Sequence, residues 1–285
     1  MTDRAPDWVI PVMRAGYAAR GLVYVTVGGL ALAAAFWGGQ AQGTQNALAD
    51  LKSLPFGDLL LWIAGLGLLA YTIWRLIDAA MDLEDYGHDA KGIVARLGQV
   101  VTGLIHGAIG VSVIGLAMGG GGQSGSGAEN WTAKLMSMPY GPVMVGIVGA
   151  GVIGAGIYYA QKGLREKYKE NIRVTRTTER LDPLMKAGFV AEGIVVGIIG
   201  GFLIYAAFTA DPQQAGGVGQ ALGYVRSLAY GQILFGALAI GLICFAIENW
   251  IEAVYRIVPR HAGPDVQSLA SRARAKAEAE VRKAV

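Results

Sequence analysis

The chain has 285 residues, of which 53% are hydrophobic, 16% are charged and 43 are glycine. A soluble domain carries about 25% charged residues and about 7% glycine, so this composition excludes an ordinary soluble enzyme, a disordered chain and a disulfide scaffold. The formal net charge of +3 is too small to indicate a nucleic-acid partner. The composition predicts an integral membrane protein in contact with the lipid bilayer.

Six charge-free apolar runs are close to the length of about 20 residues that a membrane-spanning helix needs. In the second run the helix can continue through Arg75 and Asp78 if these side chains reach the membrane interface. We expect all six runs to span the membrane, and they cover residues 21–37, 59–74, 97–118, 141–159, 193–210 and 229–247.

The positive residues alternate between the two ends of these spans. The first, third, fifth and seventh flanking segments hold 21 of the 24 Lys and Arg residues. Because positive segments stay in the cytoplasm, this asymmetry predicts cytoplasmic N- and C-termini. The N-terminus lacks the pattern of a cleaved signal peptide, so the first span should remain in the mature protein.

Two sequence markers recur three times. The first is Arg14-Ala-Gly16-Tyr-Ala-Ala-Arg20-Gly21, which aligns with residues 96–103 and 186–193. The second is Ser53-Leu-Pro55-Phe-Gly57, which aligns with residues 137–141 and 227–231. Each repeat therefore holds one helical hairpin, and all three hairpins insert in the same orientation.

The predicted fold class is all-α: a polytopic membrane protein whose six transmembrane helices form three tandem two-helix repeats around a pseudo-threefold axis along the membrane normal. The expected segments are an N-terminal cytoplasmic segment, repeat 1, a cytoplasmic loop, repeat 2, an amphipathic cytoplasmic loop, repeat 3 and a cytoplasmic tail helix. They cover residues 1–13, 14–81, 82–95, 96–162, 163–184, 185–256 and 257–285.

The pattern resembles a bacterial family of uncharacterised integral membrane proteins, a domain of unknown function that its members carry three times. The segment from Arg14 to Tyr24, the sequence Tyr71-Thr-Ile-Trp-Arg75 and Asp78 carry this resemblance, which covers roughly residues 12–256. It implies a six-helix inner-membrane protein and no known activity. The other repeats have Thr102 and Glu192 where the first has Arg20, so the resemblance does not imply a symmetric arginine site.

Glycines four residues apart share one helix face and allow close helix contacts in a membrane. We expect the odd-numbered spans to lie at close contacts near the axis, because Gly21 has counterparts at equivalent positions of the other repeats. The predicted packing glycines are Gly21, Gly103, Gly107, Gly193, Gly197 and Gly201.

His106 is the ionisable residue deepest within a predicted span. It could relay protons or bind a ligand, or it could be a neutral imidazole bonded to a backbone carbonyl or to a neighbour such as Tyr24. We favour the structural interpretation, because the equivalent position of the third repeat is Val196.

Charged residues gather near the predicted cytoplasmic ends of the spans. We interpret them as ion pairs between repeats, which bring specificity more reliably than stability. In the alternative, Arg20 and Glu192 line the mouth of an axial path. The candidate polar network comprises His106, Tyr24, Arg20, Glu192, Arg75, Asp78, Glu248 and Glu252.

Three connecting segments have patterns of their own. The acidic loop at residues 82–89 could hold a divalent cation, but we favour a solvated connector because it lacks the spacing of a calcium loop. Residues 162–186 predict an amphipathic extension on the inner leaflet, with Leu164, Tyr168 and Ile172 on one face. Residues 44–54 predict a short interfacial helix, and similar helices in the other outer loops could cap the axis.

The sequence contains no recognisable catalytic, cofactor or metal motif, so we expect a non-enzymatic protein without a cofactor. The leading hypothesis is an accessory or assembly role with another membrane protein as a possible partner, because the spans hold almost no ionisable residue at their centres. The alternative is a channel or carrier for an ion or small solute along the pseudo-threefold axis. The sequence leaves the oligomeric state undetermined.

Overall fold

A computed structural model describes residues 6–39, 42–120, 127–259 and 266–284. This part of the chain is helical, apart from two isolated bridges that pair Ile172 with Arg256 and Arg173 with Ser268. The elements are α1 (Val9–Trp37), α2 (Thr44–Leu51), α3 (Gly57–Met81), α4 (Ala90–Ala117), α5 (Gly127–Met136), α6 (Gly141–Leu164), η1 (Lys167–Asn171), α7 (Arg176–Thr209), η2 (Pro212–Gln214), α8 (Val218–Ser227), α9 (Gly231–Tyr255) and α10 (Leu269–Ala284).

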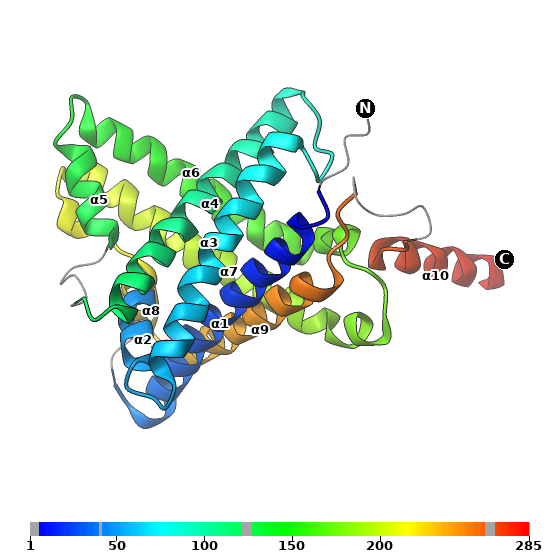
Figure 1. Ribbon diagram of the computed structural model, residues 1–285, viewed down its shortest axis with the longest axis horizontal. Coiled ribbons are helices and arrows are strands. Elements are labelled where there is room, and N and C mark those ends of the chain that lie inside the picture. Colours follow the sequence, from blue (N-terminus) through cyan, green and yellow to red (C-terminus); the bar gives the residue numbers. More distant parts are fainter. Residues whose placement is uncertain (1–5, 40–41, 121–126, 260–265, 285) are drawn as a thin grey trace.

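The six long helices α1, α3, α4, α6, α7 and α9 are each long and apolar enough to cross a membrane. They confirm the six predicted spans, and they confirm the all-helical fold of three two-helix repeats. The start of α1 and the helix α10 lie toward one end of the bundle, and α2, α5 and α8 lie toward the other (Figure 1). We call these the terminal end and the cap end.

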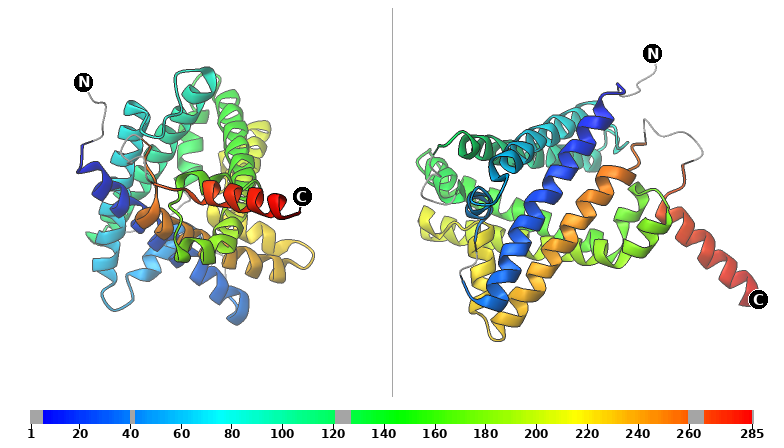
Figure 2. Two further views of the ribbon diagram at one scale, coloured as in Figure 1. Left: turned by 90° about the vertical axis from the view of Figure 1, so that its right-hand side faces the viewer. Right: turned by 60° about the horizontal axis from the view of Figure 1, so that its bottom comes forward.

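The long helices pack in the order α4, α3, α1, α9, α7 and α6. The contacts between repeats are equivalent: α3 packs against α4, α6 against α7, and α9 against α1 (Figures 1 and 2). The two helices also pack together within the first repeat and within the third. In the described part of the chain, α4 and α6 of the second repeat lack such a contact, so the ring of helices is open there.

The surroundings of one equivalent glycine position near the terminal end differ between the second repeat and the other two. A Cβ added to Gly16 in α1 would lie 2.5 Å from the Cα of Tyr71, and one added to Gly188 in α7 would lie 2.6 Å from the backbone nitrogen of Phe245. Only glycine fits where two backbones are this close. The equivalent Gly98 in α4 has no atom within 4 Å of an added Cβ.

The second helix of each repeat shows the same difference. A Cβ added to Gly67 would lie 2.3 Å from the Cβ of Ala19, and one added to Gly241 would lie 2.3 Å from the Cβ of Ala191. The equivalent Gly151 in α6 has nothing within 4 Å. Two independent positions thus locate the break in the ring between α4 and α6.

The second sequence marker forms the turn that starts each second helix. The aromatic residues of the marker adopt left-handed backbone conformations, with φ of 63° at Phe56, 61° at Tyr140 and 59° at Tyr230. Such angles are uncommon for bulky side chains, and here the rings stay more than 80% exposed. Glycine must follow, because a Cβ at Gly57 would lie 2.3 Å from the carbonyl oxygen of Leu51.

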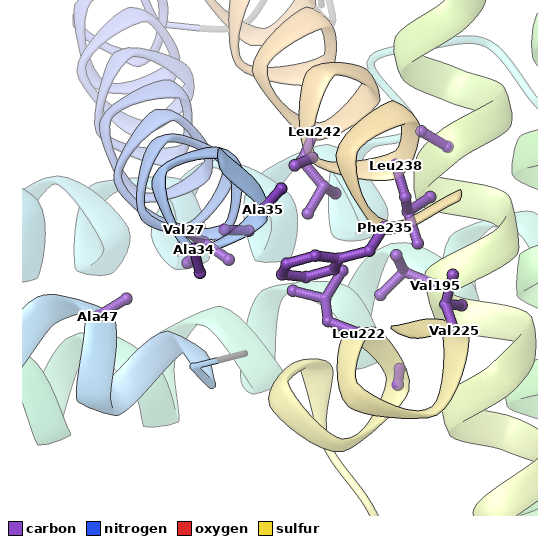
Figure 3. Close-up of a cluster of buried hydrophobic side chains, with 14 residues drawn as sticks. Val27, Ala34, Ala35, Ala47, Val195, Leu222, Val225, Phe235, Leu238 and Leu242 are labelled. Atoms are coloured by element: carbon purple, nitrogen blue, oxygen red, sulfur yellow. The ribbon is translucent and has the colours of Figure 1, made fainter. Parts of the chain in front are cut away.

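A hydrophobic cluster fixes α1, α7 and α9 together at the cap end (Figure 3). Phe235 from α9 is fully buried, and α8 contributes Leu222 and Val225. The short helix predicted within residues 44–54 is α2, which contributes Ala47. Equivalent short helices, α5 and α8, precede the marker in the other repeats.

The segment between α6 and α7 differs from the predicted amphipathic extension at residues 163–184. α6 ends at Leu164, and α7 already begins at Arg176. Tyr168 and Ile172 are each 1% exposed and pack in a core cluster with Met185. The fourfold spacing was therefore wrong as a sign of a lipid-facing helix, because a turn at η1 directs these side chains into the protein.

The tail predicted over residues 257–285 contains α10, which extends away from the bundle (Figures 1 and 2). The start of α10 lies near η1, and Arg272 approaches Glu179 at 3.9 Å.

Candidate functional site

Arg20 lies on the face of α1 that points into the bundle, and it is only 4% exposed. Its Nε donates a hydrogen bond to Nε2 of His106 at 3.0 Å, and its Nη1 donates to the hydroxyl of Tyr71 at 3.1 Å. The guanidinium also lies over the Tyr71 ring, 4.8 Å from its centroid, and over the rings of Tyr24 and Phe245. Arg20 therefore joins α1 to three other helices, α3, α4 and α9, through hydrogen bonds and cation–π contacts.

His106 uses both ring nitrogens within the protein. Nε2 accepts from Arg20, which always donates, so it must carry a lone pair. Nδ1 lies 2.8 Å from the carbonyl oxygen of Thr102, to which it can only donate. This geometry requires a neutral imidazole protonated at Nδ1, and the predicted neighbour Tyr24 bonds elsewhere.

Arg75 is the most connected cation of this site. Its Nε donates to the Tyr71 hydroxyl at 2.9 Å, and its Nη2 donates to the Tyr17 hydroxyl at 2.8 Å. Its Nη1 lies 3.1 Å from Oδ2 of Asp78 and 3.3 Å from Oε1 of Glu84. These bonds fix the terminal end of α3 to α1 and to the loop that follows α3.

Glu84 connects this group to the third repeat. Its side chain is 3% exposed and forms ion pairs with Arg75 and Arg256, and it accepts a hydrogen bond from the Tyr86 hydroxyl at 2.7 Å. Burial alone would raise the pKa of Glu84, but the guanidinium groups of Arg256 and Arg75 hold that pKa well below its usual range. Arg256 also pairs with Glu252, so Glu84 joins repeat 1 to repeat 3.

A second contact links α1 to α7. The Tyr24 hydroxyl donates to Oε1 of Glu192 at 2.5 Å, and Glu192 is 6% exposed. Arg20 and Glu192 occupy equivalent positions of repeats 1 and 3, yet they form no ion pair within 4 Å in the described structure. Glu248 is 3% exposed and lies one turn before Glu252 on α9.

The structure thus brings Arg20, His106, Arg75 and Asp78 into one connected group. Glu252 belongs to the same group, because it pairs with Arg256, which pairs with Glu84, the partner of Arg75. Tyr24 and Glu192 form an adjacent pair. The predicted network did not include Tyr17, Tyr71, Glu84 and Gln99, of which Tyr71 joins Arg20 to Arg75 and Gln99 donates to Asp78 at 2.8 Å. Tyr17 and Gln99 were detectable, because they occupy the same position of the repeated first marker.

The acidic loop at residues 82–89 is not the solvated connector that we favoured. Asp82 is 2% exposed and accepts hydrogen bonds from the backbone nitrogens of Tyr86 and Gly87, and Glu84 lies in the ion-pair group. Asp89 caps the start of α4 by accepting from the Gly92 nitrogen. Among the described residues, no group of three or more His, Cys, Asp or Glu side chains is placed to hold a metal ion.

The first glycines of the three predicted packing surfaces all lie between repeats. A Cβ added to Gly21 would lie 2.3 Å from Nε1 of Trp250 in α9. A Cβ added to Gly103 would lie 3.0 Å from the Cβ of Arg75 in α3, and one added to Gly193 would lie 2.6 Å from the backbone nitrogen of Ala160 in α6. Each odd-numbered span therefore packs against the even-numbered span of a neighbouring repeat. The odd-numbered spans contact one another instead through side chains, because α1 bonds to α4 through Arg20 and His106 and to α7 through Tyr24 and Glu192.

The remaining predicted glycines differ in their surroundings. A Cβ added to Gly107 would lie 2.9 Å from Oγ1 of Thr72. Gly197 is close to α6, because a Cβ added to Gly156 would lie 2.6 Å from the backbone nitrogen of Gly197. Gly201 has nothing within 4 Å, whereas its neighbour Gly200 is in close contact with α6. The fourfold spacing thus misses by one residue near the cap end of α7.

Comparison of the sequence with known proteins identifies the family of the chain. A family model described as Domain of Unknown Function (DUF1206) matches the chain three times, at residues 15–82, 97–166 and 187–256. The chain belongs to the DUF1206 family. A similar protein is the uncharacterised protein YxxB of Bacillus subtilis (strain 168). It is 30% identical over 253 residues, which cover 87% of this chain and 92% of the relative. No solved structure matches. Each match to the DUF1206 model spans one hairpin, so the break between α4 and α6 falls within a repeat.

Proposed function

We propose that this DUF1206 protein is a non-enzymatic protein of the bacterial inner membrane, with cytoplasmic termini, that acts as an accessory or assembly partner of other membrane components. The observation that carries the proposal is the use of the buried polar groups. Arg75 bonds to Tyr17, Tyr71, Asp78 and Glu84, and both nitrogens of His106 have partners within the protein. Groups bonded in this way hold helices together, a structural task that requires no substrate.

The surface best suited to a protein partner is the outward side of α4 and α6. The most apolar window of each helix is 17% buried, against 39–56% for the other four long helices. Val111 on α4 and Ile147 on α6 are 63% and 69% exposed. Large apolar surfaces of this kind can accept another transmembrane helix in place of lipid.

Cross-linking in native membranes tests this proposal. The tagged chain, expressed at its natural level, is purified in mild detergent and analysed by quantitative mass spectrometry. We expect a reproducible membrane-protein partner, reduced by the double substitution Val111→Trp/Ile147→Trp. Leu66→Trp on α3, at a side chain that is 55% exposed, is the matched control and should retain the partner. Recovery of the chain alone, or equal loss in the control, would contradict the proposal.

A channel or carrier is the second candidate. One observation favours it: Arg20 and Glu192 are buried at equivalent repeat positions without a direct ion pair in the described part of the chain. Charges arranged in this way can line a path for an ion or a small solute. Liposome flux should then fall with Glu192→Gln and with His106→Ala, and flux equal to that of empty liposomes would exclude this candidate.

A further inference from the structure

The gap between α4 and α6 has a defined set of boundary residues, which we call the α4/α6 opening: Gly98 and Val101 on α4, and Gly151 and Ala155 on α6. Gly98 is equivalent to Gly16 and Gly188, and Ala155 is equivalent to Tyr71 and Phe245. The equivalent contacts are closed in repeats 1 and 3, but Gly98 and Gly151 have nothing within 4 Å, and Val101 is 55% exposed. The surfaces that would close the second hairpin are therefore free.

The charges at the terminal end of this opening also differ from those of the other repeats. The position of Asp78 in α3 and Glu252 in α9, each paired with an arginine, is occupied by Lys162 in α6. In the described part of the chain, Lys162 has no carboxylate within 4 Å, and its Nζ lies 4.6 Å from the centroid of the Phe189 ring. Repeat 2 thus has a base where the other repeats have an acid, and this base interacts with Glu248 and Glu252 of α9 only at longer range.

Lys162 lies two helical turns beyond Ala155, so it is on the same face of α6 as the opening. Lys91 precedes Gly98 by the same interval and is exposed at the start of α4. From the start of α6 to Lys162 the helix rises roughly 30 Å, the thickness of the hydrocarbon core. Both lysines therefore lie at the level of the lipid headgroups at the terminal end.

We propose that an anionic phospholipid of the leaflet at the terminal end binds in the α4/α6 opening. Its phosphate lies at the level of Lys91 and Lys162, and an acyl chain runs along the free faces of Gly98 and Gly151. Basic pockets between transmembrane helices on the cytoplasmic side are suited to anionic headgroups. A lipid chain fits a surface that lacks side chains, and a second copy of the protein would instead bring like-charged lysines together.

Native mass spectrometry of the full chain, delipidated and then titrated with phosphatidylglycerol or phosphatidylethanolamine, tests this site. We expect one phosphatidylglycerol to be retained more tightly than phosphatidylethanolamine. Lys162→Ala should weaken its retention about fivefold, as expected for one basic residue near anionic lipid. Lys134→Ala, in α5 at the cap end, removes the same charge and should leave retention unchanged.

Filling the opening gives a second test that does not depend on charge. Gly151→Leu should reduce phosphatidylglycerol retention without unfolding the protein, because nothing lies within 4 Å of an added Cβ. Gly29→Leu in α1 is the matched control, since Gly29 also has nothing within 4 Å of an added Cβ and α1 does not border the opening.

Equal retention of the two lipids, or equal effects of Gly151→Leu and Gly29→Leu, would overturn the proposal. Competition by soluble glycerol phosphate as strong as that by phosphatidylglycerol would replace the lipid with a free phosphate. A protein dimer lost with Gly151→Leu would assign the opening to a second copy. Ile147 of the partner surface lies one turn from Gly151 on the same face of α6, so the Lys162→Ala result is the one that separates the lipid site from the accessory role.

Discussion

Glu84 is the residue on which the ion pairs of repeats 1 and 3 converge. It contacts Arg75 from α3 and Arg256, which follows α9, and all three side chains are largely buried. A buried ion pair contributes little relative to an apolar pair, but removing one member leaves a buried charge without compensation. The network is therefore most sensitive to the loss of a single charge.

Glu84→Gln should lower the free energy of unfolding by about 3–5 kcal/mol, because Arg75 and Arg256 lose their shared carboxylate. Reversible unfolding in detergent, followed by circular dichroism, measures this change. Glu170→Gln is the control, because Glu170 is exposed in η1. Equal stability of the two variants would show that the ion pairs at Glu84 do not stabilise the fold.

The same residue predicts a pH dependence. The pKa of Glu84 is lowered in the folded protein by Arg256 and Arg75, against the opposing effect of burial. Its stabilising contribution is therefore complete above the unfolded pKa of about 4.3 and is lost as the pH falls through the folded pKa. The stability difference between wild type and Glu84→Gln should be constant from neutral pH to about pH 5 and should shrink in more acidic buffer. A difference that grows on acidification would contradict this assignment.

The Tyr71 hydroxyl accepts hydrogen bonds from both Arg20 and Arg75. Tyr71→Phe removes only this oxygen and leaves two buried donors without their acceptor, so we expect a loss of about 1–3 kcal/mol of stability. Tyr158→Phe on α6, where the side chain is 53% exposed, should change stability by less than about 0.5 kcal/mol. Thermal unfolding of the two variants in one detergent gives the comparison.

At the scale of helices, equivalent positions of the three repeats can be compared directly. Gly16, Gly98 and Gly188 share one sequence position but have different surroundings, since only Gly98 is free of neighbours within 4 Å. Glycine is therefore required in α1 and α7 by close helix contact, and in α4 this requirement is absent.

Alanine substitution at these positions should separate them. Gly16→Ala and Gly188→Ala should each cost about 1–3 kcal/mol, because the new methyl group overlaps the backbone of α3 or α9. Gly98→Ala should be neutral or stabilising by up to about 1 kcal/mol, since alanine favours a helix more than glycine does. A loss at Gly98 as large as at Gly16 would mean that α4 and α6 pack together in the membrane.

At the scale of the whole molecule, the sequence was sufficient for the six spans and the threefold repeat, because apolar length and repeated markers are local properties. It did not predict the packing of α1 on α9, since three equivalent hairpins can associate in more than one way. The role of Glu84 was hidden for a similar reason: an acidic loop looks solvated until the fold brings Arg256 to it. The break between α4 and α6 was also not predicted, because Gly98 and Gly151 resemble their counterparts in sequence.

Distances between spin labels at equivalent positions of the three repeats test the open ring most directly. The labelled pairs are Leu22 with Ile73, Leu104 with Ile157, and Ile194 with Ile247, each changed to cysteine in a Cys244→Ala background and measured by double electron–electron resonance in nanodiscs. We expect the pairs of repeats 1 and 3 to give similar distances and the pair of repeat 2 to give a longer one. Three equal distances would contradict the open ring, and with it the proposed lipid site between α4 and α6.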